Sequence, residues 1–240
     1  MTLEKLGGCC KSSFSTSSGD FHVQYKTMLE KYTHIIWDWN GTLLDDVELC
    51  FSTINALLAK RGLQPIKDIG TYREIFGFPI IDYYRRAGFD FANEPFDVPA
   101  AEFIERYHSD DSRFRLFDGA AEILAAVNAM GLRQVILSAS EINNLRAQVG
   151  LFDIAPYFDA ILGISNIYAG SKIAIGREYV ARNGIENAVI IGDTVHDYEV
   201  AQALGADCIL IANGHQHRHT LLDCGVPVLD DLRDIRAGRE

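Results

Sequence analysis

Short runs of apolar, often β-branched residues recur along this chain, and such runs are typical of strands buried on both faces of a parallel sheet. The runs are residues 34–39, 133–138, 158–164, 188–193 and 207–212. Three stretches beside the later runs have apolar residues at helical spacing, and each ends at a glycine. They are residues 119–131, 171–184 and 196–205. This alternation predicts right-handed βαβ units and an α/β fold with a doubly wound parallel sheet.

Residues 46–115 follow a different pattern. Helix-like stretches fill this block, and it lacks the short β-branched runs. We expect an all-helical cap subdomain, inserted after the first strand and resting over the carboxyl edge of the sheet, where α/β proteins bind ligands. Residues 21–45 and 116–240 are then the predicted core, and the Ser-rich residues 1–20 are predicted to form a flexible tail.

Composition narrows the range of partners. The 240-residue chain is 48% hydrophobic, which suits one domain with an insertion, and its formal net charge is −11. Nucleic acid and anionic membranes are poor partners for such a chain, so phosphates must be attracted locally, by a metal or by backbone N–H groups. Five scattered cysteines, with neither an export signal nor an apolar run of membrane length, predict a cytoplasmic protein. Oligomeric state is not predicted.

Polar side chains stand where the predicted strands and one helix begin or end. Asp38 and Ser138 end two strands, Asp193 ends a third with Asp197 four residues on, and Lys172 stands at a helix start. Alone, Asp38, Asp193 or Ser138 is more typical of a helix cap or a turn, and Lys172 of a solvated residue in the first turn of a helix. Because carboxyl ends of parallel strands share one edge, however, we expect all five to converge on one pocket suited to a divalent cation and a phosphate.

With these residues the chain resembles the haloacid dehalogenase superfamily of phosphohydrolases. Its four motifs match residues 38–42 (DWNGT), Ser138, Lys172 and residues 192–197 (GDTVHD), and the helical block stands at the family's first cap position. Residues 76–79 (FGFP) and 213–221 (NGHQHRHTL) are most similar to the phosphoglycolate phosphatase-like branch.

The resemblance implies a role for each matched residue. Asp38 would attack phosphorus to form an aspartyl-phosphate. Mg²⁺ would be held by Asp38, the backbone carbonyl of Asn40 and Asp193, with Asp197 orienting its waters.

The remaining matched residues would contact the phosphoryl group or the substrate. Ser138, Ala139 and Lys172 would bind phosphoryl oxygens, and Lys172 would also keep Asp38 ionised. Gly41 and Thr42 complete the phosphate-binding turn, and Arg73 in the cap is a candidate substrate contact.

Asn40 departs from the family's pattern, in which a second Asp protonates the leaving group and then activates water. An amide can do neither, and such help is typically worth about 10²–10⁴-fold in rate. Three interpretations stay open: a phosphatase that is slow on esters or acts on acyl phosphates, a protein that binds phosphorylated ligands without turnover, or an engineered substitution.

The expected function is a Mg²⁺-dependent phosphatase of small phosphorylated metabolites, and the alternative is a non-catalytic phospho-ligand-binding or regulatory protein. A phosphonoacetaldehyde hydrolase-like enzyme fits less well, because its Schiff base needs a cap lysine and the cap offers Lys60 and Lys67. The histidines His215, His217 and His219 alternate along the chain, which favours a surface loop over a zinc site.

Overall fold

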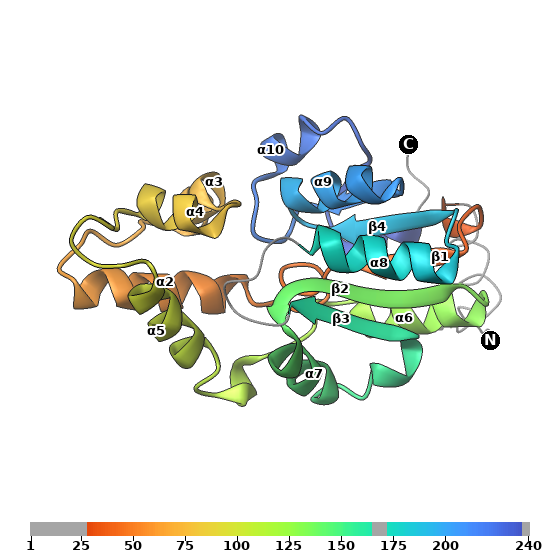
Figure 1. The fold of residues 1–240 in the computed structure, drawn as a ribbon, viewed down its shortest axis with the longest axis horizontal. Coiled ribbons are helices and arrows are strands. Elements are labelled where there is room, and N and C mark those ends of the chain that lie inside the picture. Colours follow the sequence, from red (N-terminus) through yellow and green to blue (C-terminus); the bar gives the residue numbers. More distant parts are fainter. Residues whose placement is uncertain (1–27, 165–171, 237–240) are drawn as a thin grey trace, which may run out of the picture.

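The computed structural model describes residues 28–164 and 172–236. Its sheet is parallel throughout and has the order β3-β2-β1-β4-β5-β6 (Figure 1). The strands are β1 (His34–Trp37), β2 (Arg133–Glu141), β3 (Ala160–Ile164), β4 (Ala188–Gly192), β5 (Asp207–Ile211) and β6 (Val228–Leu229). The order runs outward in both directions from β1, so the crevice expected at such a reversal lies at the carboxyl end of β1.

Helices cover both faces of the sheet, because alternate strand residues point to opposite sides. On one face Trp37, Ile136 and Ile191 pack against α6 (Ala120–Ala129) and α7 (Ile142–Gly150). On the other face Leu137 and Ile190 pack against α8 (Ile173–Asn183), α9 (Val195–Leu204) and α10 (Arg218–Leu222). The doubly wound α/β fold predicted from the sequence is confirmed.

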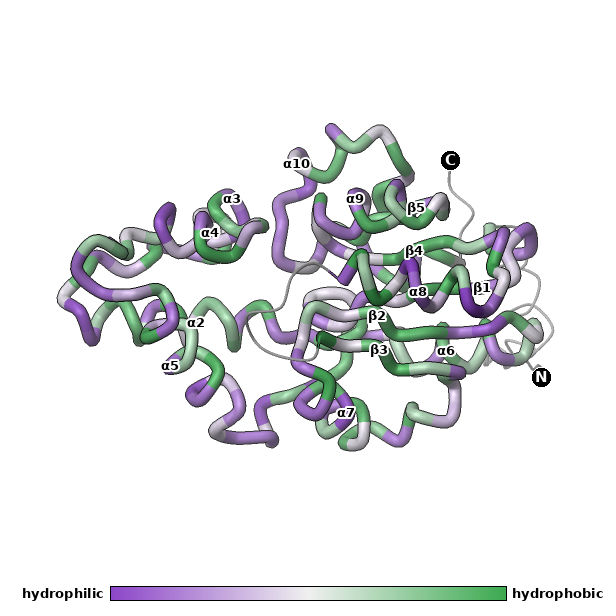
Figure 2. The backbone as a smooth tube through the Cα atoms, in the orientation of Figure 1, coloured by the Kyte–Doolittle hydropathy of each residue, from purple (hydrophilic) through white to green (hydrophobic). Residues whose placement is uncertain are grey.

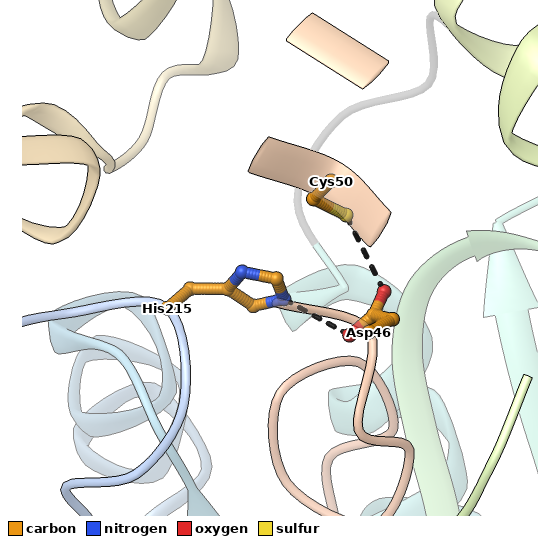
Figure 3. Close-up of side chains that lie close together, drawn as sticks. All are labelled: Asp46, Cys50 and His215. Atoms are coloured by element: carbon orange, nitrogen blue, oxygen red, sulfur yellow. Dashed lines mark hydrogen bonds and ion pairs between the residues drawn. The ribbon is translucent and has the colours of Figure 1, made fainter. Parts of the chain in front are cut away.

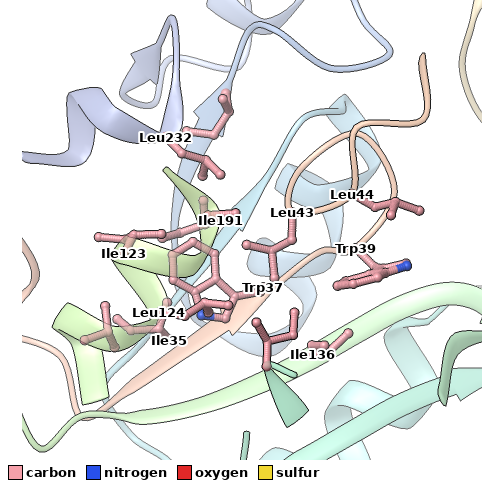
Figure 4. Close-up of a cluster of buried hydrophobic side chains, with 14 of the residues drawn as sticks. Ile35, Trp37, Trp39, Leu43, Leu44, Ile123, Leu124, Ile136, Ile191 and Leu232 are labelled. Carbon is pink, nitrogen blue, oxygen red and sulfur yellow. The ribbon is translucent and has the colours of Figure 1, made fainter. Parts of the chain in front are cut away.

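Two tryptophans anchor the segment that leaves β1 (Figure 4). Both are fully buried, and each indole N–H finds a buried amide: Trp37 donates to Gln134 at 3.1 Å and Trp39 to Gln148 at 2.9 Å. Because buried indole N–H groups need a partner, these bonds fix the orientation of both rings on either side of Asp38.

A helical block lies beyond the carboxyl ends of the strands (Figure 1). It consists of α2 (Val47–Lys60), α3 (Ile69–Ile75), α4 (Ile80–Ala87), α5 (Asp97–Tyr107) and a single 3₁₀ turn, η1 (Asp111–Arg113). These helices alternate between hydrophobic and hydrophilic residues, whereas the strands are hydrophobic along most of their length (Figure 2). Their apolar faces enclose a core of their own that includes Ile54, Leu58, Tyr72 and Tyr84.

The two segments that join this block to the sheet run side by side. Leu44 and Leu116 form an antiparallel bridge, the Asp45 N–H donates to the Arg115 carbonyl at 2.9 Å, and the Arg115 guanidinium donates to the Asp45 carboxylate at 2.7 Å. The predicted division of the chain at residues 45/46 and 115/116 falls within these paired segments, and it stays a prediction.

Some elements differ from the expectation. The helix α7, the helix α10, the short 3₁₀ turns η2 (Ala155–Tyr157) and η3 (Leu232–Arg236) and the edge strand β6 were not predicted. The predicted tail, residues 1–20, lies outside the described residues. Among the described helices, none combines the length and the apolar character that crossing a bilayer requires.

Candidate active site

Asp38 follows β1 and meets the ammonium of Lys172, which precedes α8. The Lys172 Nζ lies 2.5 Å from Asp38 Oδ1 and 2.5 Å from Asp197 Oδ1. All three side chains are buried. Three groups predicted from separate parts of the sequence are thus joined by direct ion pairs.

Asp197 also closes the turn between β4 and α9. Its Oδ2 accepts from the Thr194 N–H and hydroxyl and from the Asp193 N–H, while the Thr194 hydroxyl accepts from the Asp197 N–H in a capping box. Asp197 therefore holds Lys172 and the turn that carries Asp193 in fixed positions. Its predicted contact with metal-bound water stays a prediction.

Asp193, fully buried at the end of β4, faces the turn after β1. The Thr42 hydroxyl donates to Asp193 Oδ1 at 3.2 Å and lies 3.5 Å from Asp38 Oδ2. Gly41 has φ +75°, and a Cβ at this position would collide with the Asp193 carboxylate. Glycine is required here for both its backbone conformation and its lack of a side chain.

Asn40 lies between the turn after β1 and the end of β2. Its Oδ1 accepts from the Ser140 hydroxyl at 2.7 Å and from the Ser138 hydroxyl at 3.5 Å, while Ser138 Oγ accepts from the Ser140 N–H. Ala139 lies between these serines, where the pairing of β2 with β3 shifts register. Local irregularities of this kind re-aim backbone and side chains at the edge of a sheet.

Three buried carboxylates share this edge of the sheet with the single ammonium group of Lys172. Oxygens of Asp38, Asp193 and Asp197 lie within 4.8 Å of one another. Burial raises the pKa of Asp38 to about 8 and that of Asp193 to about 6, although Lys172 opposes the shift at Asp38 and His215 opposes it at Asp193. Lys172 thus lowers the pKa of Asp38, but burial has the larger effect, so the expectation that Lys172 keeps Asp38 ionised is wrong for the metal-free protein.

A second buried cluster adjoins this one and was not predicted. His215 Nε2 lies 3.2 Å from Asp46 Oδ1, its Nδ1 lies 2.9 Å from the Tyr72 hydroxyl, and its backbone N–H donates to Asp193 at 2.6 Å. Figure 3 shows His215 and Cys50 on two sides of Asp46. The expectation that all three histidines lie on the surface is wrong for His215, which is buried. Its ring packs against Tyr72 and Phe76 of the helical block and faces the Asp46 carboxylate.

The side chains of His217 and His219 form a separate group with Glu74. Their Nδ1 atoms lie 2.7 Å apart, and His219 Nε2 lies 3.4 Å from the Glu74 carboxylate. His219 is exposed and His217 is partly exposed, as expected, but His219 lies in α10 and His217 caps that helix, so these two histidines do not form a loop.

Arg73 connects the helical block to the loop after β5. Its guanidinium donates to the carbonyls of Asn213 and Gly214 at 2.6 and 2.8 Å, and the Gln216 side chain donates to the Phe76 carbonyl at 3.1 Å. The structure therefore places Arg73 in a bridge between α3 and the core. Its predicted contact with substrate stays a prediction.

The family is decided by comparison with known proteins. The model of the haloacid dehalogenase-like hydrolases matches residues 35–211, which include the strand ends and Lys172. The chain belongs to the haloacid dehalogenase-like hydrolase family. The resemblance inferred from the four motifs is confirmed.

The individual relatives share only a modest fraction of their residues with this chain. The chain is 28% identical over 186 residues to tyrosine-protein kinase PtkA of Mycobacterium tuberculosis, an alignment that covers 75% of this chain and 62% of the relative. It is 26% identical over 191 residues to phosphoglycolate phosphatase of Caulobacter vibrioides, covering 75% and 79%. Among solved structures, a haloacid dehalogenase-like hydrolase from Streptococcus pneumoniae matches with a TM-score of 0.72 at 18% identity, covering 84% of this chain and 94% of the other.

Proposed function

We propose that this protein is a Mg²⁺-dependent phosphatase of small phosphorylated metabolites that acts through an aspartyl-phosphate on Asp38. The observation that carries the proposal is the position of Asp38 at the carboxyl end of β1, bonded to Lys172 and with oxygens of Asp193 and Asp197 within 4.8 Å. A nucleophilic carboxylate, a buried ammonium and a set of oxygen ligands are the groups that phosphoryl transfer requires.

The buried acids fit Mg²⁺. This hard cation prefers oxygen ligands, and Asp38, Asp193 and the Asn40 backbone carbonyl would hold it. The raised pKa values of Asp38 and Asp193 reflect buried negative charge that Lys172 and His215 do not fully offset. A bound Mg²⁺ would supply positive charge against the phosphoryl oxygens.

Asp38 performs the covalent chemistry. One carboxylate oxygen attacks phosphorus, the bond from phosphorus to the leaving oxygen breaks, and that oxygen departs with the electron pair. Water then attacks the phosphorus of the aspartyl-phosphate, the bond to Asp38 breaks, and its electron pair restores the carboxylate. The water's proton passes to the released phosphate or to solvent, while Lys172 and the Ser138 hydroxyl offset charge on the phosphoryl oxygens.

The relatives named as phosphoglycolate phosphatases support this substrate class, and 79% of the Caulobacter enzyme is covered by the alignment. Because the chain spans only 62% of the mycobacterial kinase relative, that protein's activity is not carried over. Three free cysteines among the described residues are consistent with the proposed cytosolic location.

The phosphonoacetaldehyde hydrolase-like alternative gains no support from the cap lysines. Lys60 pairs with Glu102 at 2.6 Å within the helical block, and Lys67 is exposed beside Asp68. Neither contacts Asp38 or the other strand-end residues. The phospho-ligand-binding alternative keeps the same site and differs only in turnover.

A panel of phosphate esters and acyl phosphates, assayed with Mg²⁺ and with chelator, tests the proposal. We expect phosphate release that requires the metal and a phosphoenzyme that is lost in Asp38→Asn. Asp193→Ala should weaken Mg²⁺ binding measured by calorimetry. Tight binding of phosphorylated ligands with no phosphate release would favour the binding-protein alternative.

A further inference from the structure

Asp46 is the acceptor at the centre of the second buried cluster. Its Oδ1 accepts from the Gly41 N–H at 3.0 Å and faces His215 Nε2 at 3.2 Å. Its Oδ2 accepts from Asn40 Nδ2 at 2.9 Å and from the Tyr107 hydroxyl at 2.6 Å. Asp46 is thus a buried carboxylate that faces donors on every side, and its hydrogen bonds reach the turn after β1, α5 and the loop after β5.

The Asn40 side chain supplies the donor that the Asp46 carboxylate accepts. Its amide nitrogen donates to both Asp46 and Tyr107, and its amide oxygen accepts from Ser140 and Ser138. Only a carboxamide can donate on one side and accept on the other in this way without a titrating proton. Both amide hydrogens are engaged, so Asn40 has none to give to a leaving group.

A second carboxylate at position 40 would face Asp46 across a hydrogen-bond distance with no hydrogen between them. Two buried carboxylates in such contact cannot both ionise, because like charges repel strongly away from water. Positions 40 and 46 therefore have room for one carboxylate between them, and the donors of Gly41, Tyr107 and His215 surround Asp46.

We propose that Asp46 is a positioning residue that fixes residue 40 as an amide, so that the site prefers phosphorylated compounds whose leaving group departs as a stable anion, such as acyl phosphates, over alkyl phosphate esters. This inference rests on the proposed phosphatase function. When Asp38 attacks an acyl phosphate, the bond between phosphorus and the acyl oxygen breaks and the electron pair stays on a carboxylate, which needs no proton. An alkoxide leaving group does need one, and neither Asn40 nor the engaged Asp46 offers it.

A cycle of Asn40→Asp, Asp46→Asn and the double variant tests the pairing through stability alone. With chelator present, Asn40→Asp should lower the midpoint of thermal unfolding by about 4 °C or more, and by more than Asn40→Ala does, because it adds a buried charge. In the Asp46→Asn background the same Asn40→Asp change should cost little. Asp45→Asn, which alters the neighbouring partly exposed acid, is the matched control and should not change the effect of Asn40→Asp. An Asn40→Asp protein as stable as wild type, or more stable than Asn40→Ala, would overturn the pairing.

Kinetics with acetyl phosphate and 2-phosphoglycolate test the selectivity. Wild type should show the higher kcat/KM on acetyl phosphate, and Asn40→Asp alone should lose activity on both probes. The double variant should raise the ratio of 2-phosphoglycolate to acetyl phosphate activity by about 10²-fold or more, the scale of a positioned general acid. A rise of that size in Asn40→Asp alone would overturn the proposal. Inactivity of every protein on both probes would overturn the phosphatase assignment and the selectivity, while the unfolding cycle would still decide the pairing of Asp46 with Asn40.

Discussion

Lys172 Nζ lies 2.5 Å from Asp38 Oδ1, in a buried ion pair between a residue that follows β1 and a residue that precedes α8. The same ammonium is shared with Asp197. One cation therefore serves two carboxylates. Burial would lower the pKa of Lys172, but Asp197 and Asp38 raise it, so Lys172 stays charged.

Asp38→Asn should abolish phosphate release while preserving the fold. The amide keeps the shape of the side chain but removes the proposed nucleophile, and the loss in kcat should be about 10⁴-fold or more. Steady-state kinetics and circular dichroism measure the two expectations. Asp159→Asn is the matched control, because Asp159 is an acid paired with Arg133 away from the site. Turnover near the wild-type rate in folded Asp38→Asn would exclude an aspartyl-phosphate on this residue.

Gly41→Ala should destabilise the protein more than Gly62→Ala. Both glycines have positive φ, +75° and +66°, so both alanines incur a conformational cost of about 1–2 kcal/mol. A Cβ on Gly62 meets nothing within 4 Å, whereas a Cβ on Gly41 collides with Asp193 and His215. We expect an additional loss of about 2 kcal/mol for Gly41→Ala in urea unfolding, as overpacking in a rigid site predicts. Equal losses would mean that the turn after β1 can shift away from Asp193 at little cost.

His215 obeys the same rule that predicts Asp38, Ser138 and Asp193 at the carboxyl edge of the sheet. Ser138 is predicted to end its strand, but β2 continues to Glu141, so Ser138 lies within the strand near its carboxyl end. Asp38 and Asp193 directly follow buried strands, and parallel strands bring such residues together. His215 follows β5 in the same manner, but its alternating histidine neighbours suggested a surface loop. The chain that covers it comes from α3, which no local pattern in residues 213–219 can reveal.

The contact between Asp46 and Tyr107 could not be predicted from the sequence for a related reason. In the sequence, Asp46 is one of two acids before a predicted helix, and Tyr107 is one apolar position on another. Their contact joins residues 61 positions apart across the helical block. Local periodicity predicts which face of a helix is buried, but it does not predict which hydroxyl meets which carboxylate.

Arg73→Gln should loosen the bridge between α3 and the loop after β5. It removes two charge-assisted hydrogen bonds to backbone carbonyls, so urea unfolding should show a loss of about 1–2 kcal/mol and kinetics a higher KM. Arg85→Gln is the matched control, because Arg85 is an exposed arginine on α4 that pairs with Asp82. If stability were unchanged while activity fell, Arg73 would act by contacting substrate instead.

His215→Gln should change how the stability of the metal-free protein depends on pH. Burial alone would lower the pKa of His215, but Asp46 and Asp193 raise it to about 9 from an ordinary value of 6.5. A group whose pKa is raised by folding contributes stability that is complete below the unfolded pKa and is lost as pH rises through the folded value. The stability of wild type minus that of His215→Gln should therefore be largest below pH 6.5 and should shrink toward pH 9.

The size of that change should be at most on the order of 3 kcal/mol, the free energy that separates a pKa of about 9 from one of 6.5. Urea unfolding between pH 6 and 9.5, with chelator present, measures it. Asp193 also titrates in this range, and because His215 lowers its pKa, the Asp193 carboxyl binds a proton more readily in the variant, which reduces the measured change. His219→Gln is the matched control, because His219 is exposed at the start of α10, and its substitution should leave the pH dependence unchanged. A difference between wild type and His215→Gln that stayed constant across the range would mean that His215 is neutral in the folded protein, and the charge of Asp46 would then lack its counter-ion.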